Sequence, residues 1–338
     1  MRVLYLLNYA GNGGSERYIE TLISALDERI TPFFAYNIRG ALVERLEQSG
    51  VPCFQISMSG PFDFGASREL AQICSEHKID VIHTHFMREM VIATRTKVRF
   101  TRTLKIVNTV HMTERKRGMT GLLNWWYSHY NSANIAVSRA VLENLRREHV
   151  KNAVLIYNGV DVGYFHPKPV AHDEFRVACV GRFSVEKGQR YLIEVARLLP
   201  NINFVFAGEG ELLQECKGSA PSNCEFIGYA EDTRELLNSA DLYVCPSLEE
   251  ALGLSVLEAM ACGLPTVVTD AGGLPELVTP ECGDIVPKGD SAALANAIRN
   301  MANDPIRRAK CAVGALRRVR EHFNLDSTAE GIFKLYGD

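Results

Sequence analysis

Short apolar runs alternate with longer amphipathic segments along most of this chain, and this alternation limits the folds that are open to it. Runs such as 3–7 and 242–245 have the composition of buried strands, and a segment with helical periodicity follows each of them. Strands that are buried on both faces and joined by helices are typical of parallel βαβ units. The sequence therefore predicts an α/β protein with parallel sheets.

The length of the chain indicates more than one domain. Its 338 residues suit two domains of about 160 residues each. A segment with two prolines, 165–173, has the composition of a linker between them. The hydrophobic content of 46% and the charged content of 23% are those of a soluble globular protein. The net charge of −3 gives no general attraction to nucleic acid.

The cysteines and the apolar runs predict a cytoplasmic protein. The nine cysteines are scattered and form no Cys-x-x-Cys pair, so we expect reduced, mostly buried thiols. The apolar start of the chain is too short for a signal peptide and leads directly into a glycine loop. No apolar run reaches the 18 residues or so that a membrane span needs.

Two glutamates in the stretch 245–263 give the clearest indication of a ligand. Seven residues separate Glu250, in a loop after a strand, from Glu258, in a helix predicted over 254–262. The free N–H groups at the start of that helix, at Leu254 and Ser255, favour an anion. Carboxylates repel phosphate but accept hydrogen bonds from hydroxyls. A sugar nucleotide satisfies both the helix N–H groups, with its diphosphate, and the carboxylates, with its hydroxyls. The alternative is a solvated Glu250 and a Glu258 on an ordinary helix face.

A second motif supplies positive charge. Arg182 and Lys187 stand five residues apart in a strand-to-helix connection, with Gly181 and Gly188 beside them. Two cations on a glycine-bounded loop form a clamp for a diphosphate. Taken alone, this segment could also be a surface loop.

Together, these motifs resemble those of the retaining glycosyltransferases of family 4, which have the GT-B fold. The resemblance rests on Gly-Arg-Phe-x-x-x-Lys-Gly and on the two glutamates followed by Ala-Met-Ala-Cys-Gly. It implies two Rossmann-like βαβ domains whose parallel sheets face an interdomain cleft. Residues 1–165 would bind the acceptor and 166–320 the nucleotide-sugar donor, and a helix in 321–338 would cross back to the first domain.

Glycine turns at the ends of predicted strands supply further donor contacts. Gly13 and Gly14 lie in the first loop, which is not a dinucleotide fingerprint because Glu16 stands where the third glycine is needed. The resemblance implies that this loop faces the donor diphosphate. It also implies that the strand ends at Gly208 and Gly228 flank the nucleotide base. A tight turn without a ligand is the alternative for the first loop.

Histidines end two predicted strands of the first domain. His83 and His85 point to the same face of one strand; His83 is expected in the core, and a metal site is not expected because no third ligand is apparent. His111 ends the strand predicted over 105–111. The resemblance places His111 near the transferred sugar. His85 ends its strand, where ligands of open α/β sheets bind, and we expect it to contact the acceptor together with Arg115 of the basic region. A strand-end histidine without a ligand is the alternative.

A basic region precedes the only two tryptophans. Residues 88–117 hold nine lysines or arginines and two acids, a local charge of +7, and Leu-Leu-Asn-Trp-Trp-Tyr follows at 122–127. Such a region, 88–126, suits an anionic membrane surface or a phosphorylated acceptor. The alternative is a solvated basic face with a tryptophan in the core.

The motifs lead to a prediction of metal-independent transfer. No Asp-x-Asp pair occurs, and the clamp can neutralise a leaving diphosphate instead. We therefore expect no metal or other cofactor. The resemblance implies a hexosyltransferase that retains the anomeric configuration, in which Glu250, His111, Arg182 and Lys187 act at the reacting centre. The donor is expected to be UDP-linked and the acceptor a glycan or lipid-linked saccharide of the cell envelope. The alternatives are a sugar-nucleotide epimerase or hydrolase, and a membrane-docked scaffold that only binds a sugar nucleotide.

Overall fold

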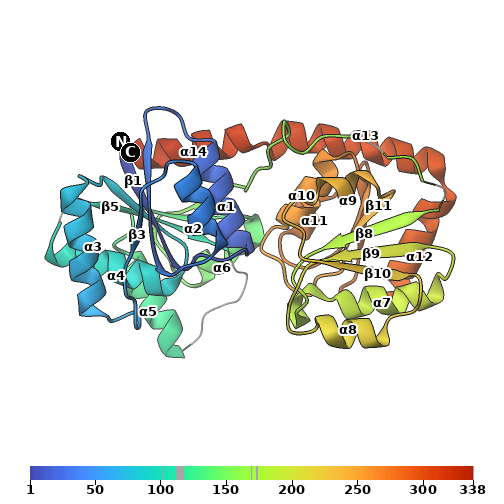
Figure 1. Ribbon diagram of the computed structural model, residues 1–338, viewed down its shortest axis with the longest axis horizontal. Coiled ribbons are helices and arrows are strands. Elements are labelled where there is room, and N and C mark those ends of the chain that lie inside the picture. The colour runs from blue at the N-terminus through green and yellow to red at the C-terminus, as the bar shows by residue number, and fades with distance from the viewer. Residues whose placement is uncertain (102, 112–117, 169, 173, 338) are drawn as a thin grey trace. The chain divides into compact units, whose positions relative to one another are not determined.

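The computed structural model describes residues 1–101, 103–111, 118–168, 170–172 and 174–337, and the chain divides into two compact units. Unit 1 comprises Met1–Asn158 and Leu325–Asp338, and unit 2 comprises Gly159–Asn324 (Figure 1). These divisions fall a few residues from the expected positions at 165 and 320. The reason is that Val160 bridges to Asn324 and its N–H donates to the carbonyl of Phe323, which fixes the segment after 158 within unit 2.

Unit 1 is built on a parallel sheet of seven strands in the order β3-β2-β1-β4-β5-β6-β7. The strands are β1 (Arg2–Tyr9), β2 (Thr31–Ile38), β3 (Cys53–Gln55), β4 (Val81–Thr84), β5 (Lys105–Val110), β6 (Ala133–Ala136) and β7 (Ala153–Leu155). The helices are α1 (Gly14–Ser24), α2 (Ala41–Gln48), α3 (Phe64–Glu76), α4 (Met87–Arg99), α5 (Gly118–Ser128), α6 (Arg139–Arg147) and α14 (Leu325–Gly337). Because β1, β4 and β5 are neighbours, the loops after them leave the same edge of the sheet.

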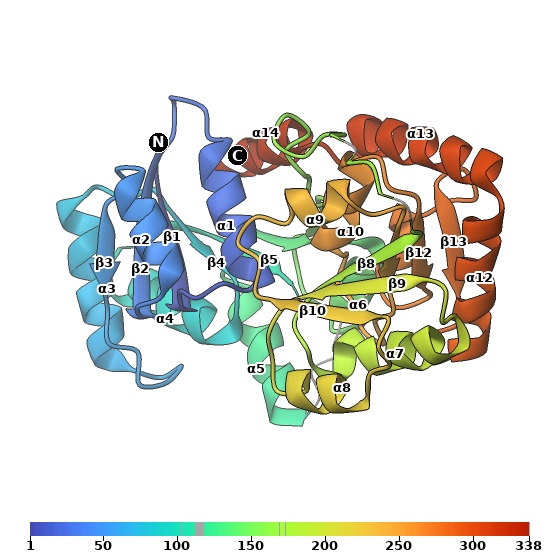
Figure 2. The ribbon, with the colours of Figure 1, turned by 45° about the vertical axis from the view of Figure 1, so that its right-hand side comes forward.

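Unit 2 is built on a parallel sheet of six strands in the order β10-β9-β8-β11-β12-β13. The strands are β8 (Arg176–Val180), β9 (Asn203–Ala207), β10 (Cys224–Gly228), β11 (Leu242–Cys245), β12 (Thr266–Thr269) and β13 (Gly283–Val286). A 3-10 turn, η1 (Val185–Lys187), precedes α7 (Gln189–Leu198), and the other helices are α8 (Leu213–Ser219), α9 (Arg234–Asn238), α10 (Leu254–Ala261), α11 (Leu274–Leu277), α12 (Ser291–Asn303) and α13 (Pro305–His322). Figure 2 shows β8, β9 and β10 side by side.

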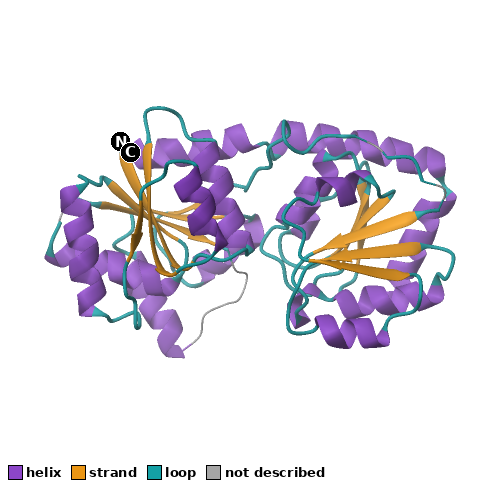
Figure 3. Cartoon of the chain, in the orientation of Figure 1, coloured by secondary structure: helices purple, strands orange, loops and turns teal. Residues whose placement is uncertain are grey.

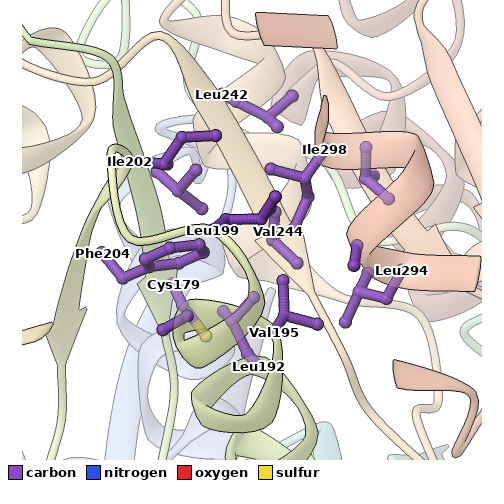
Figure 4. Close-up of a cluster of buried hydrophobic side chains, with 14 of the residues drawn as sticks. Cys179, Leu192, Val195, Leu199, Ile202, Phe204, Leu242, Val244, Leu294 and Ile298 are labelled. Carbon is purple, nitrogen blue, oxygen red and sulfur yellow. The ribbon is translucent and has the colours of Figure 1, made fainter. Parts of the chain in front are cut away.

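The cores explain why these segments form strands and helices. In unit 2, apolar side chains of β8, β9 and β11 meet those of α7 and α12, as Cys179, Phe204, Val244, Val195 and Ile298 illustrate (Figure 4). Helices cover both faces of each sheet (Figure 3), so strands need apolar side chains on both sides. The predicted α/β architecture with parallel sheets is confirmed in both units.

The sequence predicts side-chain caps at two helix starts, by Ser138 for the helix that runs to Arg147 and by Ser291 for the helix that runs to about Met301. Ser138 accepts a hydrogen bond from the Val141 N–H, as predicted. The prediction that Ser291 caps the helix after it is wrong, because Asp290 accepts from the Ala293 N–H at 2.9 Å. Ser291 instead donates its hydroxyl to Glu194. Among the helices of the described residues, none has both the length and the apolar composition needed to cross a membrane.

Candidate active site

In unit 2, the two predicted motifs meet at the carboxyl edge of the sheet. Lys187 follows β8 and Glu250 follows β11, and these strands are neighbours. The Lys187 Nζ atom donates to Glu250 Oε2 at 2.6 Å, and Ser247 Oγ donates to the same oxygen at 3.3 Å. Burial alone would lower the pKa of Lys187, but the facing Glu250 carboxylate helps to raise it above its usual value. The lysine is therefore a cation held by one carboxylate.

The backbone locks these two loops together. The carbonyl of Glu186 accepts from the N–H groups of Leu248 and Glu249, at 2.7 and 3.2 Å. Gly188 has a φ of +66°, and a Cβ atom there would lie 2.2 Å from the carbonyl oxygen of Pro246. Only glycine permits this close approach, so the glycine after Lys187 fixes the lysine beside Glu250.

Arg182 does not join this pair. Its guanidinium donates to Glu186 Oε1 at 2.9 Å, and its side chain is mostly exposed. Each of the two predicted clamp cations thus has its own carboxylate partner. A diphosphate that bound both cations would replace these carboxylates as their counter-charge.

Glu258 and the first turn of α10 lie after the same loop. Glu258 is buried on α10. The N–H groups of Val256 and Leu257 donate to the carbonyl of Gly253, so those of Leu254 and Ser255 precede the helical hydrogen bonds. The sequence predicted a helix over 254–262 and the structure has it over Leu254–Ala261, which confirms the helix. An anion at this helix start would be favoured by the helix dipole.

The predicted base-flanking glycines are neighbours. The N–H of Gly208 donates to the carbonyl of Gly228 at 2.7 Å, across the ends of β9 and β10. A Cβ atom on Gly208, whose φ is +141°, would lie 2.1 Å from the carbonyl oxygen of Gly181. The ends of β8, β9 and β10 are therefore joined through backbone groups.

In unit 1, polar side chains hold the end of β1, which leads into the glycine loop. The Asn8 N–H donates to Glu89 Oε1 at 2.6 Å, and Asn8 Oδ1 accepts from Arg88 at 2.7 Å. Gly13 precedes α1, and a Cβ atom there would lie 2.6 Å from the buried carboxylate of Glu16. The sequence reasoning missed Glu89, which it treated only as one charge in the basic region. Burial raises the pKa of this carboxyl group.

Three histidines stack at the ends of β4 and β5. His83 is buried, with Nδ1 2.6 Å from Tyr336 Oη and Nε2 2.7 Å from Thr109 Oγ1, which confirms its predicted place in the core. His85 lies next to it, and its Nδ1 is 3.1 Å from Nε2 of His111. Burial lowers the pKa of His83 to about 3 and that of His111 to about 4, so both rings are neutral at pH 7.

The two residues predicted to contact the acceptor are His85 and Arg115. Arg115, an expected acceptor contact, lies outside the described residues, as do three other cations of the basic region, Arg102, Lys116 and Arg117. His85 is only 3% exposed, so a direct contact with an acceptor does not fit its place behind His111. Over the residues that the structure describes, no group of three or more histidine, cysteine, aspartate or glutamate side chains is arranged to hold a metal ion.

One face of α5 is apolar and exposed. Met119, Leu122 and Trp126 are 70, 56 and 55% exposed, and their spacing places them on one side of the helix. Trp126 is therefore not a core residue, whereas Trp125 is partly buried and packs against His129 at 4.6 Å between ring centroids. The alternative of a tryptophan in the core fits Trp125 in part and does not fit Trp126.

Comparisons with known proteins support the family that the sequence motifs resemble. The family model described as "Glycosyl transferases group 1" matches residues 174–304, and the model "Glycosyltransferase Family 4" matches residues 12–164. A putative glycosyltransferase EpsD of Bacillus subtilis is 29% identical over 284 residues, 72% of this chain and 74% of its own. The UDP-Gal:alpha-D-GlcNAc-diphosphoundecaprenol alpha-1,3-galactosyltransferase of Escherichia coli is 24% identical, over 96% of this chain and 90% of its own.

The fold also matches solved structures. The crystal structure of Anabaena Alr3699/HepE in complex with UDP and glucose has a TM-score of 0.89 and covers 100% of both chains at 22% identity. At that identity the likeness concerns the fold, which is GT-B.

Proposed function

This chain belongs to the group 1 glycosyltransferases of family 4, and on that premise we propose that it moves a hexose from a UDP-sugar to a glycan or lipid-linked acceptor with retention of configuration. The observation that carries the proposal is the ion pair of Lys187 and Glu250 beside the first turn of α10. A cation and a helix N-terminus suit a diphosphate, and the carboxylate next to them suits sugar hydroxyls. The UDP-sugar named for the Escherichia coli relative supports the choice of base.

Binding of the donor would exchange partners at this pair. Lys187 turns from Glu250 to the diphosphate, and Arg182 turns from Glu186 to the same group. Glu250 then accepts hydrogen bonds from the sugar hydroxyls, and Glu258 accepts from the ribose hydroxyls. His111, neutral at pH 7, contacts the transferred sugar. The backbone groups at Gly208 and Gly228 bind the base, and the loop at Gly13 and Gly14 binds the diphosphate.

The transfer step follows from these contacts. The bond between the anomeric carbon and the diphosphate oxygen breaks, and a bond from the acceptor hydroxyl oxygen forms on the same face. The hydroxyl proton passes to the leaving diphosphate oxygen, so no protein carboxylate forms a covalent intermediate. Lys187, Arg182 and the N–H groups of α10 stabilise the negative charge of the leaving group.

We expect transfer to proceed at full rate without a divalent metal. The charge of the leaving diphosphate is balanced by two side-chain cations and a helix start, which replaces the role of a bound metal. The rate of sugar transfer should therefore change less than about 2-fold when EDTA is added to metal-depleted protein. A rate that disappears with EDTA and returns with Mg²⁺ or Mn²⁺ would refute metal independence.

The acceptor proposal rests on the relatives. The name of the Escherichia coli enzyme gives its acceptor as alpha-D-GlcNAc-diphosphoundecaprenol, and we take an acceptor of this lipid-linked class to be the substrate here. We propose that it acts on this lipid at the cytoplasmic face of the membrane, in cell-envelope polysaccharide synthesis. An acceptor-dependent product distinguishes this function from an epimerase or hydrolase, which would convert the sugar nucleotide without any acceptor.

A membrane surface on unit 1 fits this acceptor. The exposed face of α5 continues into an aromatic and basic area: the rings of Tyr127 and Phe62 lie 6.5 Å apart, and the Arg95 guanidinium lies 3.7 Å from the ring centre of Phe64. Arg99 lies over the same Phe64 ring, 5.2 Å from its centre. Apolar side chains beside cations have the chemistry that binds an anionic bilayer.

We expect the double substitution Leu122→Glu/Trp126→Glu to weaken binding to anionic vesicles by at least about 10-fold. Each substitution removes apolar area that the bilayer would bury, and adds a negative charge that the anionic lipids repel. Co-sedimentation with phosphatidylglycerol-containing vesicles measures this. Ile306→Glu is the control, since Ile306 is likewise an exposed apolar side chain, at 70%, but lies on α13 of unit 2. Unchanged vesicle binding with a changed oligomeric state would show instead that a second copy of the chain covers this face.

A further inference from the structure

Two buried histidines, His83 and His85, have no role in the proposed chemistry, and of these His85 has a ring nitrogen without a hydrogen-bond partner in the part of the chain that the structure describes. Its ring is stacked between those of His83 and His111, with centroid distances of 4.7 and 5.3 Å and interplanar angles of 22° and 26°. The Tyr18 ring packs edge-on against His111 at 4.8 Å. His85 is therefore held in one orientation by its neighbours, directly behind the histidine that is proposed to touch the sugar.

The two nitrogens of His85 have different surroundings. Nδ1 lies 3.1 Å from Nε2 of His111, whereas Nε2 is buried and has no hydrogen-bond partner among the described residues. A hydrogen bond between two neutral imidazoles needs one protonated nitrogen and one bare nitrogen. The proton in the His85–His111 bond can therefore belong to either ring, and the choice fixes the tautomer of both.

The buried nitrogen decides between the two arrangements. If His111 donated from Nε2, His85 would accept at Nδ1 and would carry its own proton on Nε2, where a buried N–H would have no acceptor. If His85 donates from Nδ1, its Nε2 is a bare acceptor. Buried N–H groups without a partner are rarer than under-satisfied acceptors, so the second arrangement is favoured. His111 then accepts at Nε2 and carries its proton on Nδ1.

We propose that His85 is a positioning residue, which holds His111 through an Nδ1–H···Nε2 hydrogen bond and thereby makes His111 a neutral hydrogen-bond donor at Nδ1. This inference rests on the proposed function, because the proposed function gives His111 its role at the sugar. An N–H group at Nδ1 of His111 can donate a hydrogen bond to a hydroxyl or ring oxygen of the transferred sugar. A neutral ring also avoids repulsion with the positive charge that develops on a sugar as its leaving group departs. His85 therefore acts through His111 and does not touch the acceptor.

Nuclear magnetic resonance tests the tautomer without any assay of transfer. Protein labelled with ¹⁵N-histidine gives two-bond ¹H–¹⁵N correlations that separate protonated from bare ring nitrogens. The signals of His85 and His111 are assigned by their loss in His85→Asn and His111→Asn. We expect His111 to be protonated at Nδ1 and bare at Nε2 at pH 7. A proton on Nε2 of His111, or a cationic ring, would overturn the proposal even if the protein proves to be an active transferase.

Two substitutions at His85 test the effect on the reaction. Asparagine can place an N–H near the position of Nδ1, whereas leucine fills similar space and cannot donate. We expect His85→Leu to lower kcat by about 10- to 100-fold, by analogy with the loss found when a partner that orients a metal-bound imidazole is removed. The dissociation constant for UDP should stay within about 2-fold, because the residues proposed to bind UDP most directly lie in unit 2, and His85→Asn should recover most of the rate.

A double variant separates positioning from loss of fold. In a His111→Ala background, His85→Leu should cause no further loss of kcat, because the residue through which it acts is gone. Equal losses for His85→Asn and His85→Leu, or losses that add to that of His111→Ala, would count against positioning. If no variant or wild-type protein transfers sugar while the Nδ1–H tautomer is found, the failure lies with the proposed function and not with the His85–His111 hydrogen bond.

Discussion

Replacing Glu250 with glutamine is expected to lower the rate of sugar transfer by about 100- to 1000-fold, the range for loss of one group that stabilises the transition state. Glutamine keeps the size of the side chain but removes the charge that accepts from sugar hydroxyls. The same change leaves Lys187 without its carboxylate partner at 2.6 Å. The lysine then offers its full charge to a diphosphate, so the affinity for UDP should hold or rise by up to about 10-fold, an equivalent of ~1.4 kcal/mol.

Opposite changes in rate and affinity make this prediction specific. The rate is measured with saturating donor and acceptor, and the affinity for UDP by calorimetry. Glu249→Gln is the matched control, because Glu249 is the exposed neighbour of Glu250 in the same loop. If Glu250→Gln kept more than a tenth of the wild-type rate, the role of Glu250 at the sugar would be wrong. A parallel loss of rate and UDP binding would indicate a disturbed loop instead.

The local rules of the sequence predicted the frame of this site well. The apolar runs predicted the strands, and the helix that carries Glu258 was predicted over 254–262. That helix lies between Gly253 and Gly263, and glycines at helix ends have a direct local effect on the backbone. The alternation of side chains along a strand placed His83 and His85 on one face, and the structure stacks their rings. Properties that depend on neighbouring residues in the sequence could therefore be predicted.

Contacts between residues that are distant in the sequence could not be predicted in the same way. Glu89 binds the Asn8 N–H across 81 residues, and no motif links the two positions. Lys187 is the sequence neighbour of Glu186, yet Glu186 pairs with Arg182, four residues before it. Lys187 pairs instead with Glu250, which follows the neighbouring strand β11. Such partners depend on the strand order and on which side chains burial brings together, which local patterns do not specify.

Replacing Glu258 with alanine is expected to weaken UDP binding by about 10- to 150-fold. The buried carboxylate of Glu258 is proposed to accept hydrogen bonds from the ribose hydroxyls, and hydrogen bonds to a charged group contribute about 1.5–3 kcal/mol. The measurement is a calorimetric titration in EDTA with UDP, GDP and ADP, on the wild type and on the variant. The nucleotide that binds most tightly to the wild type identifies the base of the donor.

A ligand without ribose hydroxyls makes the Glu258 test specific. The wild type should bind 2′,3′-dideoxy-UDP more weakly than UDP, whereas Glu258→Ala should bind the two alike, because the group that tells them apart is gone. Glu235→Ala is the control, since Glu235 is an exposed acid on α9 of the same unit. A variant that still prefers UDP over the dideoxy compound by the wild-type factor would assign ribose recognition elsewhere. Failure of every nucleotide to bind folded wild-type protein would count against UDP-sugar transfer itself, since the diphosphate, the ribose and the base would each lack their proposed partners.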